Sequence, residues 1–209
     1  MLVFCSIIIQ KEQYRNKDAL FSKSSIRASW IRAGLESQGD AMPKKKSPID
    51  HLNSPRQPHI VHLIPPGAPG HAEAKGGAMV VSSPAEVDAL IRQLEPGEVL
   101  TLDDLRAALA RRHNVAVACP VSTAIFANMS ARAAEERRQH GVSQAELTPW
   151  WRVLRKGGFL NPKLPGGVER QAVLLRNEGV TVSPLRKQLA VYDYEARRPD
   201  RKIEEASPR

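Results

Sequence analysis

Residues 148–160, with the sequence TPWWRVLRKGGFL, place a proline, two adjacent tryptophans, an apolar pair and a basic Gly-Gly turn in one short stretch. The proline sets a bend, and the glycines favour a tight reversal between the first apolar pair and the second. Residues 165–167 (Pro-Gly-Gly) follow, and an apolar-periodic stretch then ends at residues 178–179 (Glu-Gly). This order predicts a short hairpin followed by a closing helix.

Three helices are expected before this segment. Residues 83–86 (Ser-Pro-Ala-Glu) form an N-terminal capping signature, and Thr101 with Asp104 forms a second one. Pro120 opens a third helix, which Gly141 stops. Its core-facing residues are predicted from their spacing to be Val121, Ala124, Ile125, Met129 and Ala133. The expected fold is mainly α, a winged helix-turn-helix domain with a small β-hairpin wing and the third helix in the recognition position.

Changes in composition divide the chain into three parts, residues 1–81, 82–182 and 183–209. Prolines and glycines recur in the first part, which we expect to be a disordered Pro-rich arm. Met42 precedes a short basic run, so we treat Met42 as a hypothetical true start. The last part mixes both signs of charge with almost no apolar period, and we expect a mobile charged tail. The winged-helix domain is thus expected at residues 82–182.

The net charge of +9 is spread unevenly along the 209 residues. Residues 1–82 carry 11 basic and 6 acidic side chains, whereas residues 83–182 carry 13 and 11. The basic total is therefore weak support for nucleic-acid binding, because the excess lies mainly outside the expected domain. The apolar opening, residues 1–9, is too short to span a bilayer, so we expect a cytoplasmic protein without a membrane partner.

No metal, cofactor or disulfide is expected. Four histidines lie in the Pro-rich part at spacings that match no metal-ligand pattern: His51, His59, His62 and His71. Cys5 and Cys119 lie in different segments, far apart in the sequence. Cys119 immediately precedes the third helix, whose N-terminus favours a thiolate. A thiol-dependent enzyme is therefore one alternative, although a small half-buried residue before Pro120 is the simpler interpretation.

Residues 149–153, Pro-Trp-Trp-Arg-Val, lie ahead of a Gly-Gly and a helix that ends in Glu178-Gly179. This order resembles the DNA-binding domain of the alkylguanine-DNA alkyltransferases, whose signature is Pro-Cys-His-Arg-Val, then Gly-Gly, then a helix ending in Glu-Gly. The resemblance covers about residues 82–182. It puts Trp150 at the cysteine nucleophile and Trp151 at the histidine base.

The resemblance also implies that Arg152 is kept and that Glu178 matches the glutamate that orients the base. Transfer of an alkyl group cannot run without thiol and imidazole. The chain therefore resembles the alkyltransferase-like, cysteine-lacking proteins, which bind alkylated DNA and flag it for repair without removing the lesion. The family's recognition helix begins Arg-Ala-Val-Gly, whereas this chain has Cys-Pro-Val-Ser at residues 119–122.

The implied partner is double-stranded DNA, with a repair protein as a further partner. The candidate DNA- or lesion-binding residues are Trp150, Trp151, Arg152, Arg155, Lys156, Ser122 and Thr123. Adjacent tryptophans on an extended segment face opposite sides, so one is expected in the core and the other is a candidate for stacking on a base. Arg155 and Lys156 at the turn fit phosphate contacts by a wing. The alternative from another class is a protein-interaction module that kept the scaffold and lost DNA binding.

Overall fold

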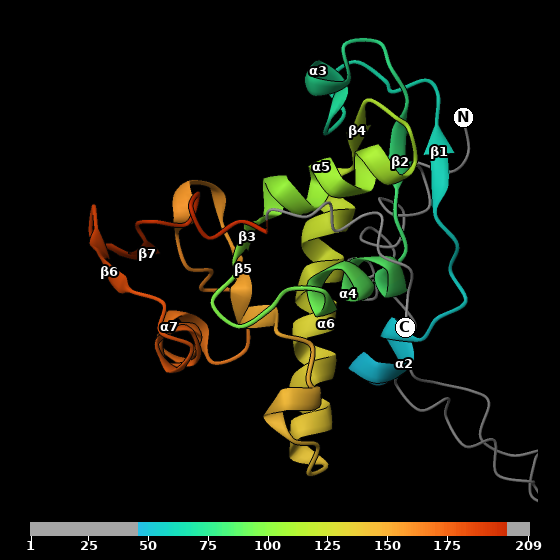
Figure 1. The fold of residues 1–209 in the computed structure, drawn as a ribbon. Helices are drawn as coiled ribbons and strands as arrows, with labels where there is room; N and C mark the ends of the chain where they lie inside the picture. The colour runs from blue at the N-terminus through green and yellow to red at the C-terminus, as the bar shows by residue number, and fades with distance from the viewer. Residues whose placement is uncertain (1–45, 200–209) are drawn as a thin grey trace, which may run out of the picture. The chain divides into compact units, whose positions relative to one another are not determined.

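In the computed structural model, which describes residues 46–199, the long helix α6 (Pro120–Gln139) contacts α2, α4, α5 and the η2 turn (Figure 1). The other helices are α2 (Pro48–Leu52), α3 (His71–Ala74), α4 (Pro84–Arg92), α5 (Leu102–Arg112), α7 (Gly167–Asn177) and the 3-10 turns η1 (Gln144–Glu146), η2 (Trp150–Arg152) and η3 (Lys156–Gly158). The strands are β1 (His59–Val61), β2 (Met79–Val81), β3 (Leu100–Thr101), β4 (Val117–Ala118), β5 (Val153–Leu154), β6 (Val182–Leu185) and β7 (Gln188–Val191). They form three small sheets, β1-β2-β4, β3-β5 and β6-β7. Met42 lies outside the described residues, and no helix within residues 46–199 is long and apolar enough to cross a membrane.

Both N-caps are confirmed, whereas the reciprocal capping box forms only at Thr101, since Glu86 Oε1 contacts His113 and Arg112 instead. Ser83 Oγ accepts a hydrogen bond from the Glu86 backbone N–H at 3.2 Å and begins α4. Thr101 Oγ1 accepts from the Asp104 N–H at 3.2 Å, and Asp104 Oδ2 accepts from the Thr101 N–H at 2.8 Å, which completes the reciprocal box of α5. These starts depend only on residues a few positions apart, which is why the sequence predicts them well.

The predicted inner face of α6 is right for Ala133 and in part for Met129, and wrong for its first three residues. Val121 and Ile125 are 48% and 52% exposed, and Ala124 is exposed as well. The buried face is built mainly from small side chains: Ser122, Thr123, Phe126, Ala127, Ser130, Ala131, Ala133 and Ala134. Small residues let neighbouring helices approach closely. Their position along α6, more than the hydrophobicity of single residues, therefore decides which face of the helix is buried.

The domain begins earlier than residue 82. Leu52 of α2 is 2% exposed, and the Ile49 N–H donates to Glu136 Oε2 of α6 at 3.0 Å. Strand β2 pairs antiparallel with β1 and parallel with β4, and Met79 and Val80 are 1% and 0% exposed. The part of the expected arm that the structure describes is therefore folded. Its prolines fall mostly in the connections, where they do not interrupt a strand.

The wing hairpin predicted within residues 148–160 is also corrected. Val153 and Leu154 pair in parallel with Leu100 and Thr101 of β3, so β5 joins a strand from far along the sequence. The antiparallel hairpin in this half of the domain is β6–β7, and it follows α7 (Figure 1). The hairpin falls in the stretch expected as a mobile tail, so the domain extends beyond residue 182.

Candidate functional site

The tryptophan pair forms part of the core. Trp150 and Trp151 are 1% and 3% exposed, and their rings meet edge to face with centroids 5.9 Å apart. The segment is the 3-10 turn η2 and not an extended strand, so neighbouring side chains point about 120° apart and both rings enter one apolar cluster. Neither ring offers a free face on which a base could stack in this conformation, contrary to the expectation for one of them.

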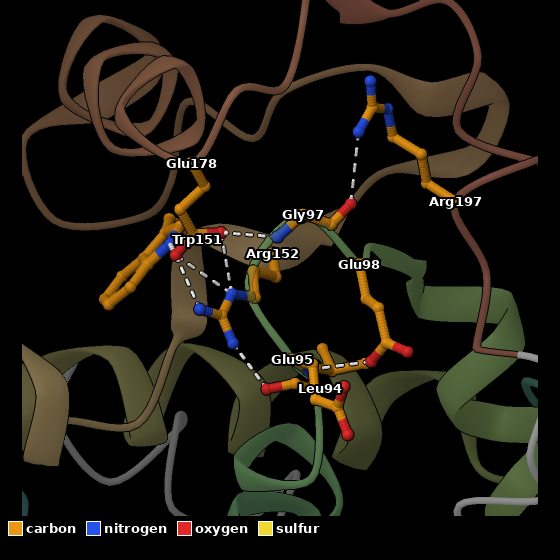
Figure 2. A network of polar contacts seen from close by, with 8 residues as sticks. All are labelled: Leu94, Glu95, Gly97, Glu98, Trp151, Arg152, Glu178 and Arg197. Carbon is orange, nitrogen blue, oxygen red and sulfur yellow. Dashed lines mark hydrogen bonds and ion pairs between the residues drawn. The ribbon is translucent and has the colours of Figure 1, made fainter.

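Glu178, at the C-terminal end of α7, gathers the motif residues (Figure 2). Its Oε1 accepts hydrogen bonds from Trp151 Nε1 at 2.8 Å and from Arg152 Nη2 at 2.6 Å. Its Oε2 accepts from Arg152 Nε at 2.9 Å and from the Gly97 N–H at 3.3 Å. The residue at the family's histidine position thus contacts the glutamate that the resemblance assigned to orient it.

Arg152 connects this carboxylate to the end of α4. It is 7% exposed, and its Nη1 donates to the Leu94 carbonyl at 2.5 Å. The guanidinium carbon also lies 5.6 Å from the centre of the Trp151 ring. Because Nε, Nη1 and Nη2 all donate to protein acceptors and the residue is buried, Arg152 holds three segments together and is not available to a phosphate in this conformation.

Two further groups fix the site, and the sequence did not single them out. Gln171 of α7 is fully buried, and its Nε2 donates to the carbonyls of Trp151 and Val153, both at 2.9 Å. Arg197 donates from Nη1 to the Gly97 carbonyl at 3.4 Å (Figure 2). Its own carbonyl accepts from the Val99 N–H at 3.0 Å. No local pattern marks such long-range contacts.

The chemistry of the cluster is limited by its donor groups. An indole N–H only donates, so Trp151 cannot accept a proton as the family's histidine does. Trp150 Nε1 is buried and has no hydrogen-bond partner in the described part of the chain, which costs about 1–3 kcal/mol. Cys119 lies at the N-cap of α6, partly buried against the apolar cluster that contains Met79 and Val117.

The remaining predicted contact residues divide into two groups. Ser122 and Thr123 are buried, and their hydroxyls donate to the Cys119 carbonyl at 3.3 and 2.9 Å. They therefore serve the first turn of α6 and are turned away from solvent. Arg155 and Lys156 are exposed, as a role in contacting DNA requires.

The four histidines of the Pro-rich part lie on α2, on or just after β1, and at the start of α3. No group of three or more His, Cys, Asp or Glu residues among positions 46–199 is arranged to hold an ion. His71 Nδ1 instead bonds the Ile64 carbonyl at 2.9 Å. This contact gives one of the histidines a local structural role.

Comparison of the chain with models of protein families, with curated proteins and with solved structures found no match.

Proposed function

We propose that this protein is a non-catalytic DNA-binding protein similar to the alkyltransferase-like proteins, and that it recognises alkylated guanine. The observation that carries the proposal is the contact of Glu178 with Trp151 and Arg152. The resemblance assigned these residues to one site from two motifs separated by a helix. That assignment came from the spacing of the motifs alone, whereas the hydrogen bonds are a feature of the folded chain. The two are therefore separate support for the proposal.

The order of the helices gives further support. Two capped helices, α4 and α5, precede α6, and the first turns of α6 leave Val121, Ala124 and Ile125 exposed. These side chains carry no hydrogen-bonding groups for the major-groove code. Small and apolar side chains suit the minor groove, where recognition depends on shape and on wedges between base steps. The winged helix-turn-helix arrangement is part of this proposal.

The exposed residues Val121, Ala124 and Ile125 of α6 also favour a second candidate function. Val121 and Ile125 are about half exposed and lie one helical turn apart. An apolar pair on a helix face is also suited to packing against another protein. A protein-interaction module would bind another protein through this face and would not contact the phosphates of DNA. It would therefore show no salt-dependent binding to DNA.

The deciding measurement is binding of the full chain to duplexes with and without an alkylated guanine, by fluorescence anisotropy at several salt concentrations. We expect affinity for both duplexes to fall with salt, and the alkylated duplex to bind more tightly. Binding that is absent, or independent of salt, would contradict the proposal and favour the protein-interaction module.

Replacing Arg155 and Lys156 together by Ala should weaken binding to all duplexes about equally. Each phosphate contact contributes about 0.9 to the slope of log affinity against log salt, so the slope should fall by about 2. Arg56→Ala with Lys75→Ala is the matched control, because it removes the same charge from exposed positions on other parts of the domain. An equal fall in slope for the control would show that the salt dependence reflects the net charge of the protein and not contacts made by Arg155 and Lys156.

A further inference from the structure

The tip of the β6–β7 hairpin carries two cations in an unfavourable backbone conformation. Leu185 pairs with Gln188, which leaves Arg186 and Lys187 as a two-residue turn. Their φ angles are +47° and +65°, in the left-handed region. Asn-Gly is the preferred pair for such a turn, because both central residues need a positive φ, which most other residues adopt only with strain. The chain thus keeps two cations at a turn where Asn-Gly would be more stable.

The Arg155-Lys156 loop runs beside this hairpin. Arg155 Nη1 donates to Gln188 Oε1 at 3.1 Å, next to the tip. Further along, the Leu160 N–H donates to the Leu189 carbonyl at 2.9 Å. The two basic pairs are therefore connected by direct hydrogen bonds between their segments.

Close packing at Gly158 holds the loop in place. A Cβ atom at this position would lie 2.5 Å from the Val191 carbonyl oxygen and 2.6 Å from a ring carbon of Tyr194. Its φ of +77° also favours glycine. The loop is thus held against the end of β7 at a distance that only glycine permits.

These cations also lack acidic partners. All four side chains are exposed, and none forms an ion pair with a carboxylate of residues 46–199: Arg155, Lys156, Arg186 and Lys187. Other arginines of the domain do form such pairs, including Arg92 with Asp88 and Arg170 with Glu135. The four charges therefore remain available to an anion from outside the domain.

We propose that these four residues, here called the basic surface, bind the phosphate backbone of double-stranded DNA, with the β6–β7 hairpin acting as the wing. Double-stranded DNA carries one charge about every 3.4 Å along each strand, so it offers several phosphates to two neighbouring basic turns. The exposed part of the hairpin tip is charged and offers no apolar anchor for a bilayer. This inference rests on the proposed function, because it names the surface through which the DNA is held.

The test is a turn replacement, Arg186→Asn together with Lys187→Gly. Asn-Gly suits the turn, so we expect the melting temperature to stay equal or rise. The fall in DNA affinity between about 50 and about 200 mM salt should become smaller by about tenfold, because two phosphate contacts are lost. Arg186→Lys, which keeps the charge, should leave the salt slope unchanged. Adding Arg155→Ala and Lys156→Ala to the turn replacement should reduce the slope further.

The outcomes separate this inference from the proposed function. If the unmodified chain binds DNA with a steep salt dependence and the turn replacement keeps that slope, the hairpin is not the wing, and the proposed function stands. If the unmodified chain shows no salt-dependent binding to DNA, both fail. Charge-dependent binding to vesicles of phosphatidylserine and phosphatidylcholine, without binding to DNA, would also overturn the inference and assign the basic surface to a membrane.

Discussion

A chain that begins at Ser82 is expected to lose its cooperative unfolding transition. The deletion removes four large buried apolar side chains, Leu52, Ile64, Met79 and Val80, besides the small Ala74. Each contributes about 1.5–3 kcal/mol when buried, and their sum is comparable with the total stability of about 5–15 kcal/mol of a typical domain. The deletion also exposes the edge of β4, which pairs with β2 in the intact protein.

The measurement is thermal and urea unfolding followed by circular dichroism. A chain that begins at Met42 is the control, because it retains every described residue and should keep the melting temperature of the full chain. A Ser82 chain that unfolds cooperatively near the full-length melting temperature would contradict the packing of residues 46–81. That result would support a domain boundary at residue 82, as composition alone suggested.

The sequence predicted best what is decided locally. The caps at Ser83 and Thr101 depend on residues three positions away, and both helices begin where these caps predict. The buried face of α6 depends on the elements that pack on it, and an inward Ala or Ser leaves little signal in a hydrophobic pattern. The face was therefore misjudged where small residues, and not large apolar ones, form the contact.

Strand partners were the least predictable feature. Val153 and Leu154 could pair with the next apolar residues along the chain or with a distant strand, and no local signal separates these choices. Leu100 and Thr101 supplied buried partners, with 5% and 3% exposure. The Pro-rich arm was misjudged for a related reason, because short strands between prolines become stable only when β4 lies beside them.

The candidate site was predicted in part, and only through the family resemblance. That resemblance related Glu178 to the position of Trp151, whereas composition and periodicity place no constraint on residues so far apart; the contact of Glu178 with Arg152 came from the structure. Burial was predicted for one tryptophan of the pair, and burial of the other was missed because a 3-10 turn was taken for an extended segment. Arg186 and Lys187 were missed because the hairpin that carries them lies in a stretch with little apolar pattern.

The contact of Arg152 with Glu178 is expected to be worth the most of any single pair in the site. The two side chains are 8% and 12% exposed, so each charge depends on the other for compensation. Glu178→Gln leaves a buried guanidinium without a carboxylate and should lower stability by about 3–5 kcal/mol. For a domain of this size the melting temperature should fall by on the order of 10 °C.

A double-mutant cycle tests the pair itself. Arg152→Met removes the cation and its bond to the Leu94 carbonyl, and should also be destabilising. The double variant leaves no unpaired buried charge, so its loss should be smaller than the sum of the two single losses. Additive losses would contradict the coupling. Below the melting temperature, both single variants should keep the salt slope of DNA binding, because Arg152 makes no phosphate contact in the proposed complex; a slope reduced by about 1 in Arg152→Met would instead place its guanidinium on the DNA backbone.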